Sequence, residues 1–184
     1  MRLVILPICL SCLMALPGQA DTCPPPLEYA DRKATLLEML QSTRDANAGR
    51  FLSRELLSLL ATAPNRKAQA ALDDGMALRR GGDLDEARAV FDELVAYCPD
   101  YAEGYNQRAF VWFLQGDYDA ALRDLDAALV HAPDHAGAMA GKAITLLELD
   151  RTEEAHSVLR DALTLNPWLP ERDMLHAPPP GTAV

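Results

Sequence analysis

Two cysteines are the residues of this chain with the most specific potential chemistry. Cys98 directly precedes Pro99 in the stretch "VAYCPDYAEGYNQRA", and Cys23 is the only other cysteine outside the first twenty residues. A cysteine in this setting could be a reactive thiol, a metal ligand or half of a structural disulfide. The choice among these depends on the cellular compartment and on the elements that position the two side chains.

Other candidate chemistry has little support. His131 and His135 are four residues apart, as metal-binding histidines on a helix are, but Pro133 lies between them and breaks a helix. The stretch "GAMAGKA" at residues 137–143 is similar to a phosphate-binding loop, yet it is one residue short and has Ala143 where a magnesium-binding hydroxyl belongs. No serine stands in a nucleophile-elbow context. The sequence therefore predicts no catalytic residue, no metal site and no cofactor.

The first twenty residues, "MRLVILPICLSCLMALPGQA", have the pattern of a secretory signal peptide. Arg2 precedes an apolar stretch that ends at Leu16, and small residues follow at Gly18 and Ala20, where signal peptidase requires them. The apolar stretch is shorter than the roughly 20 residues of a membrane span. We expect cleavage after Ala20 and a periplasmic or secreted mature protein; a lipid anchor on Cys12 is the weaker alternative, because the apolar stretch continues past it.

Composition narrows the possible partners. The chain has 184 residues, 49% of them apolar and 24% charged, which is ordinary for one globular domain. Its formal net charge is −10, so it lacks the basic surface that binds phosphate backbones. No second hydrophobic segment follows the signal sequence. We expect neither a nucleic-acid partner nor membrane insertion after the signal is removed.

An internal repeat organises the rest of the chain. Prolines, large apolar residues, alanines and other small residues each recur every 34 residues. The four sets are Pro99, Pro133 and Pro167; Phe91, Leu125 and Leu159; Ala87, Ala121 and Ala155; and Gly75, Ala109 and Ala143. Each copy holds two stretches with apolar residues at helical spacing, separated by a Gly-Asp or Asp-Arg turn and ended by proline. The small residues let the two helices approach closely, and stacked copies bury a continuous core.

The repeats resemble those of a known family. "GGDLDEARAVFDELVAYCP" and "QGDYDAALRDLDAALVHAP" are similar to the second half of a tetratricopeptide repeat (TPR), as is "LDRTEEAHSVLRDALTLNP" with a changed turn. The resemblance implies an all-α fold, a right-handed superhelical α-solenoid, with repeats at residues 68–101, 102–135 and 136–169. Together with the leader, this layout is similar to that of small exported TPR-containing proteins of proteobacteria.

The segments that flank the repeats lead to further expectations. Residues 21–30 read as an extended leader, and residues 31–67 read as two helices, which we expect to cap the stack as a degenerate N-terminal pair because terminal repeats are usually atypical. Residues 170–184 read as a short flexible Pro-rich tail. The outer face of the last helix is then covered either by the segment that follows it or by a second molecule. The chain is accordingly expected to be a monomer or a weak dimer through this C-terminal edge.

The resemblance also implies a binding surface, because the first helix of each family repeat lines the concave side. This set, which we call the concave groove, comprises Met76, Arg79, Arg80, Asn106, Phe110, Phe113, Leu114, Ile144 and Leu147. An apolar floor with two arginines at one end suits an extended or helical peptide that carries acidic groups. The alternative is that some of these apolar residues pack between helices. A clamp for a C-terminal carboxylate is not expected, since Gln107 and Gly141 stand where its polar contacts would be.

These expectations together describe an exported interaction module, an adaptor without enzymatic activity whose protein or peptide partner the sequence does not identify. The alternative is a structural accessory subunit of an envelope enzyme or secretion complex, in contact through the C-terminal edge.

A set of charged residues also recurs with the repeat. Asp74, Arg108 and Lys142 stand at equivalent positions, where family repeats usually have an inward leucine, and Asp124 lies one helix after Arg108. A buried arginine without a partner would be strongly unfavourable. We therefore expect these four residues to form an internal charge ladder that fixes the stacking register.

The predicted arrangement of helices also places the two cysteines. Cys98 ends the second helix of the first copy, and Cys23 precedes the N-terminal helices, so both lie at the same end of the stack. An oxidising compartment favours a Cys23–Cys98 disulfide, and the linker from Cys23 is long enough for closure. Two free or intermolecular thiols are the alternative.

Overall fold

The computed structural model describes residues 22–27 and 29–176. The expected signal peptide, its cleavage site after Ala20 and the tail from residue 177 onward lie outside these described residues. Within them, none of the helices combines the length and the apolar character needed to cross a bilayer.

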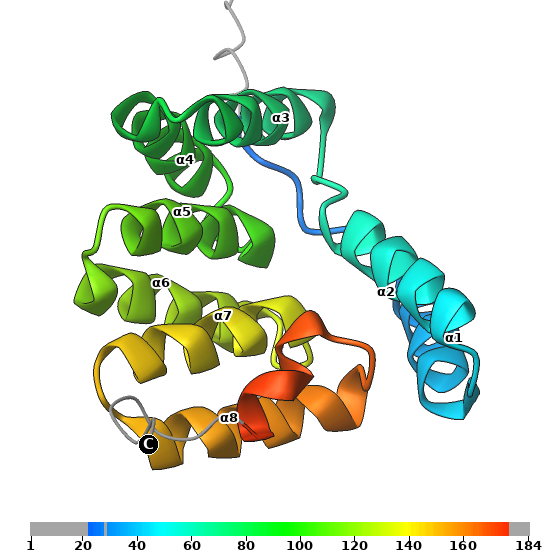
Figure 1. The fold of residues 1–184 in the computed structure, drawn as a ribbon. Helices are drawn as coiled ribbons and strands as arrows, with labels where there is room; N and C mark the ends of the chain where they lie inside the picture. The colour runs from blue at the N-terminus through cyan, green and yellow to red at the C-terminus, as the bar shows by residue number, and fades with distance from the viewer. Residues whose placement is uncertain (1–21, 28, 177–184) are drawn as a thin grey trace, which may run out of the picture.

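The described chain is all-helical, with no β-strand in residues 22–27 and 29–176. In order, the elements are α1 (Ala30–Ser42), α2 (Ala46–Leu60), α3 (Arg66–Gly81), α4 (Leu84–Tyr97), α5 (Ala102–Leu114), α6 (Tyr118–His131), α7 (Ala136–Glu148), α8 (Thr152–Leu165) and the 3-10 helix η1 (Pro170–His176). Helices α3 to α8 form three antiparallel pairs stacked one on the next, an α-solenoid (Figure 1). The fold class predicted from the repeats is confirmed.

Local chemistry sets where the helices of the stack begin and end. Asn65 and Asp117 cap α3 and α6 by accepting hydrogen bonds from backbone N–H groups at 2.9 Å. Within the pairs the turns pass through left-handed backbone at Gly82 (φ 90°) and Gly116 (φ 80°). The third copy has Asp150 at this place, with φ 57°, a conformation that aspartate tolerates better than most residues. This explains why the Asp-Arg turn replaces Gly-Asp without changing the fold.

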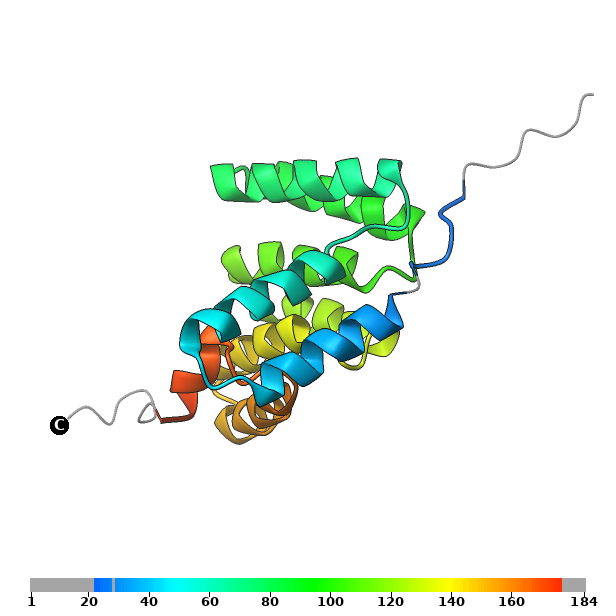
Figure 2. The same cartoon turned by 90° about the vertical axis from the view of Figure 1, so that its right-hand side faces the viewer.

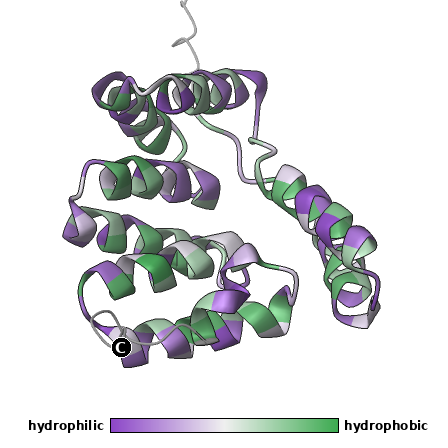
Figure 3. Cartoon of the chain, in the orientation of Figure 1, coloured by the Kyte–Doolittle hydropathy of each residue, from purple (hydrophilic) through white to green (hydrophobic). Residues whose placement is uncertain are grey.

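The predicted contact of small with large residues positions the helices of each pair. A Cβ atom on Gly75 of α3 would lie 2.6 Å from Phe91 Cε1 of α4, closer than real Cβ contacts permit. Phe91 is fully buried at this contact. In the next pair, Ala109 and Leu125 are buried in one cluster. Figure 3 shows hydrophobic and hydrophilic residues alternating along the helices, as expected when one face of each helix is buried and the other solvated.

The N-terminal pair, α1 and α2, does not cap the stack, and this corrects the expectation for residues 31–67. Instead of stacking on α3, the pair runs along one edge of the solenoid and reaches α8 (Figures 1 and 2). Its buried leucines, Leu36, Leu40, Leu52, Leu56 and Leu60, contact one another and the ring of Trp168. A cap would bury this apolar face against α3. Here the face is instead buried within the pair and against Trp168, which follows α8 at the other end of the stack.

Each of the three loops that end a repeat contacts the N-terminal pair. At the first loop, the Tyr101 hydroxyl donates to the carbonyl of Leu60 at 3.4 Å. At the second, Lys33 Nζ lies 2.7 Å from Asp134 Oδ2. The third loop is held by two hydrogen bonds, which are Asn166 Nδ2 to Ser53 Oγ (2.7 Å) and Trp168 Nε1 to the carbonyl of Leu40 (3.1 Å). The pair thus bridges all three repeats along one edge.

The segment after α8 also departs from the expectation of a flexible tail. Residues 170–176 form η1, which packs against α8. Leu169, just before it, is buried with Ala136, Ala140 and Ala162. Of the two alternatives for the last helix, the chain's own fold-back is the one present.

Cys23 and Cys98 form a disulfide, with their Cα atoms 5.1 Å apart and a sequence separation of 75 residues. Cys98 is buried beside Leu94 and Tyr101 in the core of the first pair. The bond fixes the segment before α1 to the end of α4, and so encloses the N-terminal pair in a covalent loop.

Free-thiol titration of the denatured chain from residue 21 onward, which omits Cys9 and Cys12, should detect no reactive thiol. Replacing both cysteines, Cys23→Ser with Cys98→Ser, should lower the free energy of unfolding by about 4 kcal/mol, because the chain-entropy model assigns this effect to a loop of such length. Urea denaturation of the two proteins measures the difference. Two titratable thiols per chain would contradict the assignment.

Trp168→Ala should loosen the attachment of the N-terminal pair to the third repeat, because the Trp168 ring packs against Gly49 of α2 and its Nε1 atom donates to the carbonyl of Leu40. We expect faster amide hydrogen exchange throughout α1 and α2 and unchanged exchange in α5 and α6. Trp168→Phe is the control that keeps most of the ring packing and removes the hydrogen bond. If amide exchange became equally faster in all helices, Trp168 would stabilise the whole fold and not the attachment of the N-terminal pair.

Candidate functional site

Aromatic and small residues of α5 and α7 line a hollow between these two helices. The hollow has a volume of about 190 Å³. Helix α5 contributes Asn106, Phe110 and Phe113, and α7 contributes Gly137, Gly141 and Ile144. In each helix these residues are spaced i, i+4 and i+7, so they lie on one stripe. Glu171 of η1 completes the lining, and we call this feature the α5–α7 hollow.

The two glycines of α7 make this hollow possible. A Cβ atom on Gly141 would lie 3.1 Å from Leu125 Cδ2, and one on Gly137 would lie 3.3 Å from Leu57 Cδ2. A side chain at Gly141 would therefore crowd Leu125 of α6, and one at Gly137 would crowd Leu57 of α2. The stretch that is similar to a phosphate loop, "GAMAGKA", therefore lies within a helix and serves helix contact.

An arginine from α3 extends the surface beyond the hollow. The Arg79 guanidinium lies over the Phe110 ring, 4.1 Å from its centroid, a cation–π contact. Burial, and secondarily the neighbouring charge of Arg80, lowers the pKa of Arg79 below its ordinary value. Its Nε atom is buried without a hydrogen-bond partner among the described residues. An acidic group from outside the chain would be attracted to this guanidinium.

The other residues of the predicted concave groove are placed differently. Met76 packs against the core of the first pair, which is the alternative considered for the apolar members of the set. Arg80 and Leu114 are exposed, and Leu147 is half-buried but does not line the hollow. The members of the set that the structure brings together are Asn106, Phe110, Phe113 and Ile144, with Arg79 beside them.

The recurring charges do not form the expected ladder. Arg108 makes a bidentate pair with Asp124 of α6, with both N–O distances at 2.7 Å, and its Nη1 atom lies 2.9 Å from Asp92 of α4. The hydrogen bond to Asp124 is the main cause that raises the pKa of Arg108. Lys142 pairs separately with Asp126 of α6 at 2.6 Å. Arg108 and Lys142 therefore pair with carboxylates on second helices, sixteen residues away in sequence. Neither pairs with the charged residue at the equivalent position of the neighbouring copy.

Asp74 is the position where the ladder prediction is wrong. Its side chain is exposed, and no ion pair involves it within the described residues. The corresponding position sixteen residues later is Val90, which cannot pair with a carboxylate, and α2 does not stack beside α3. The observed arrangement is an Arg108 cluster with Asp92 and Asp124 that joins α4, α5 and α6.

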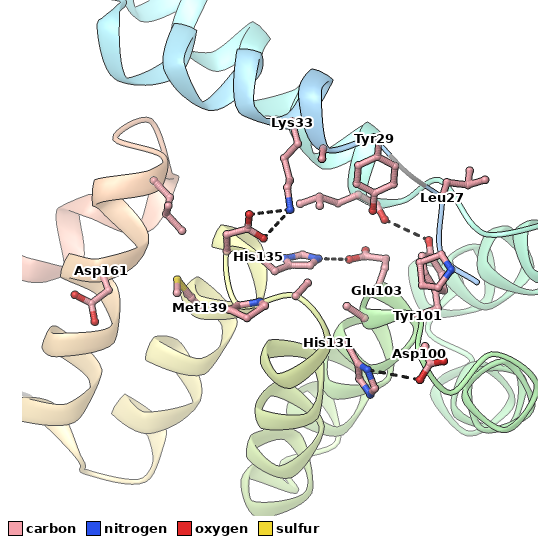
Figure 4. A pocket seen from close by; sticks show the side chains of 18 of the residues that line it. Leu27, Tyr29, Lys33, Asp100, Tyr101, Glu103, His131, His135, Met139 and Asp161 are labelled. Atoms are coloured by element: carbon pink, nitrogen blue, oxygen red, sulfur yellow. Dashed lines mark hydrogen bonds and ion pairs between the residues drawn. The ribbon is translucent and has the colours of Figure 1, made fainter. Parts of the chain in front are cut away.

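A second and larger cavity lies where the repeat-ending loops face α1. It has a volume of about 770 Å³, and we call it the edge cavity. Figure 4 shows Lys33 and Tyr29 entering from the N-terminal side and Tyr101, Glu103 and His135 from the stack. Burial, followed by the charges of Glu103 and Asp134, raises the pKa of Tyr29, so this phenol stays protonated.

Glu103 and His135 are fully engaged within the edge cavity. Glu103 is 6% exposed and accepts hydrogen bonds from Asn106, Gln107 and His135 Nε2, the last at 2.9 Å. His135 Nδ1 accepts from the backbone N–H of Ala138 and so caps α7. Because Nδ1 is an acceptor, Nε2 carries the proton, and neither nitrogen is free for catalysis or metal binding.

Sequence reasoning did not find this pair. Glu103 and His135 belong to different copies and meet only after stacking. The usable signal was the position of His135 two residues after Pro133, where a helix-capping side chain belongs. In the described part of the chain, no three His, Cys, Asp or Glu side chains gather closely enough to hold a metal ion.

Arg108→Leu should lower the free energy of unfolding by about 2–4 kcal/mol, because Asp124 would stay buried without its cation. Asp124→Leu in the same chain should recover much of the loss, since the unpaired carboxylate is then removed as well. Urea denaturation of the single and double variants measures both effects. Unchanged stability of Arg108→Leu would show that the cluster has no structural role.

Comparisons with known proteins match both halves of the chain to one family. Two profiles described as tetratricopeptide repeat match residues 53–102 and 113–177. A TPR repeat-containing protein of Rhizobium etli is 36% identical over 77 residues, 42% of this chain and 33% of that protein. Tetratricopeptide repeat protein 36 of Xenopus tropicalis is 36% identical over 88 residues, 46% of this chain and 39% of that protein. The matched region is thus well under half the length of these curated relatives.

Solved structures share the fold at low sequence identity. The first TPR domain of Spaghetti (RPAP3), bound to the HSP90 peptide SRMEEVD, has a TM-score of 0.58 and 21% identity, over 60% of this chain and 89% of that one. The TPR2B domain of yeast Sti1, in its pHsp70 complex, has a TM-score of 0.55 and 21% identity, over 61% and 90% of the two chains. A MamA RS-1 ArsTM double mutant has a TM-score of 0.52 and 18% identity, over 83% and 82%. From its repeats and its fold, the chain belongs to the tetratricopeptide repeat family.

Proposed function

We propose that this chain is an exported, non-enzymatic adaptor that binds a peptide or protein segment against α3, α5 and α7. The observation that carries the proposal is the α5–α7 hollow with Arg79 stacked beside it on Phe110. Phe110 and Leu114 are exposed apolar residues on α5, with 44% and 47% of their surfaces accessible. Exposed aromatic residues beside a hollow are typical of interaction surfaces.

Charge indicates which part of a partner this surface suits. The chain has a formal net charge of −10, yet Arg79 and Arg80 lie together in the last turn of α3. Arg79 keeps one unpartnered donor atom at this position. An acidic group of the bound segment would meet the arginines while its apolar side chains contact α5. Structural relatives of this fold are seen with bound peptides, namely those of HSP90 and Hsp70.

Support for export comes from the N-terminal sequence pattern and from the Cys23–Cys98 disulfide, because such bonds persist in oxidising compartments. The alternative, an accessory subunit that contacts its complex through the C-terminal edge, is less favoured. Helix α8 is already in contact with η1 and α1, which reduces the apolar surface free at that edge.

A crosslinking experiment in the native cell envelope tests the proposal. A photo-crosslinking amino acid in place of Leu114 should capture a partner, and the same probe in place of Val130 of α6 should not, although Val130 is 78% exposed. Phe110→Glu, or charge reversal of Arg79 and Arg80, should reduce capture at position 114 at least tenfold, roughly the effect of losing one interface hot spot.

Val130→Glu is the matched control, since it adds the same charge at an exposed apolar residue outside the surface. If capture persists in both Phe110→Glu and the arginine variant, the binding surface lies elsewhere and the accessory-subunit alternative is favoured. Mass spectrometry of the captured adduct identifies the partner.

A further inference from the structure

Glu171 is an unexplained feature of the α5–α7 hollow. It lies on η1 and lines the hollow together with Phe110, Phe113 and Ile144. Its Oε2 atom is buried and has no hydrogen-bond partner within the described residues. A buried carboxylate oxygen without a donor is unfavourable for the free protein. Glu171 also makes no ion pair within the described residues, so its carboxylate lines the hollow without a counter-ion and suits a ligand that supplies one.

Two other polar side chains, Asn106 and Thr145, line the hollow. Asn106 Nδ2 donates one of its two N–H groups to Glu103 Oε2 at 3.0 Å, and the side-chain oxygen of Asn106 is an acceptor. Thr145, also in the lining, donates its hydroxyl to the carbonyl of Gly141 at 2.8 Å. Together with Glu171 these groups offer mainly acceptor atoms, so a ligand group that donates hydrogen bonds fits, and next to a carboxylate a cation is favoured.

The size and the walls of the hollow narrow the ligand further. A volume of about 190 Å³ holds one long side chain and is too small for a drug-sized molecule. Phe110 and Phe113 supply aromatic surface, which attracts a guanidinium or ammonium group through its π electrons. Arg79 already occupies one side of Phe110, so a second cation enters from the side of α7 and η1, where Glu171 lies.

We propose that the α5–α7 hollow binds a cationic side chain, arginine or lysine, of the bound segment, with Glu171 as its counter-ion. This inference rests on the proposed function and adds the direction in which the bound segment lies across the surface. The bound segment places its acidic group at Arg79 and Arg80 of α3 and its cationic side chain at Glu171. A segment with the reverse charge order would bring like charges together at both ends, which is unfavourable.

Two small probes test the cation site directly, Nα-acetyl-arginine amide and the isosteric but neutral Nα-acetyl-citrulline amide. Titrations followed by NMR, at the Ile144 methyl and the Asn106 side-chain amide, give the two affinities at low ionic strength. The arginine probe should bind about five- to tenfold more tightly, as expected for one charge-assisted hydrogen bond at a partly solvated site. In Glu171→Gln the ratio of the two affinities should fall to about one.

Asp173→Asn is the matched control, because it removes a carboxylate from the same 3-10 helix, where Asp173 pairs with Arg172 and does not line the hollow. It should leave the ratio of affinities unchanged. A second readout is the thermal stability of the protein without probe. Glu171→Gln should raise Tm because a half-buried carboxylate without a counter-ion is removed, whereas replacing a residue with a purely structural role would lower Tm.

The outcomes separate this inference from the proposed function. Equal binding of the two probes, or a ratio that Glu171→Gln does not change, overturns the cation site, while crosslinking at position 114 that depends on Phe110 would still support the adaptor. Preference for the arginine probe without any crosslinked partner at position 114 overturns the adaptor, and with it the claim that the cation belongs to a bound segment.

Discussion

The stack depends on close approach of two helices within each pair, where a residue with little or no side chain faces a large apolar one. At Gly75 and Phe91 no Cβ atom could be added without a collision, and Ala109 and Leu125 repeat the contact in the next copy. Stacking of these pairs, through α4 on α5 and α6 on α7, then places α3, α5 and α7 side by side and decides which side chains line a common surface. The Arg108 cluster adds a charged contact among α4, α5 and α6.

The N-terminal pair changes how the solenoid is held together. In a plain array each repeat contacts only its neighbours, so stability is local. Here α1 and α2 contact the loops at the end of all three repeats, and the Cys23–Cys98 bond fixes their entry at the first loop. Contacts between residues more than 100 positions apart, such as Lys33 with Asp134, then restrain the curvature of the stack. The edge cavity is a consequence of this bridge, because α1 forms one of its walls.

The proposed binding surface combines features from distant parts of the chain. Two glycines of α7 leave space, two phenylalanines of α5 supply aromatic walls, and charged groups stand on either side, Arg79 from α3 and Glu171 from η1. Each charged group retains a buried atom without a partner in the described chain. Unsatisfied polar atoms are expected at functional sites more than elsewhere, because a ligand completes them.

The sequence by itself determined the helical pairs, the 34-residue repeat and the family. These follow from spacing along one chain, since a 34-residue period and helical periodicity are local properties. Only the tertiary structure decided where α1 and α2 lie, which carboxylates pair with Arg108, and that Glu103 meets His135 and Glu171 enters the hollow. The physical reason is that these contacts join segments whose relative placement depends on which apolar faces remain free. The leucines of α1 and α2 are buried against one another and Trp168, and no sequence period records that choice.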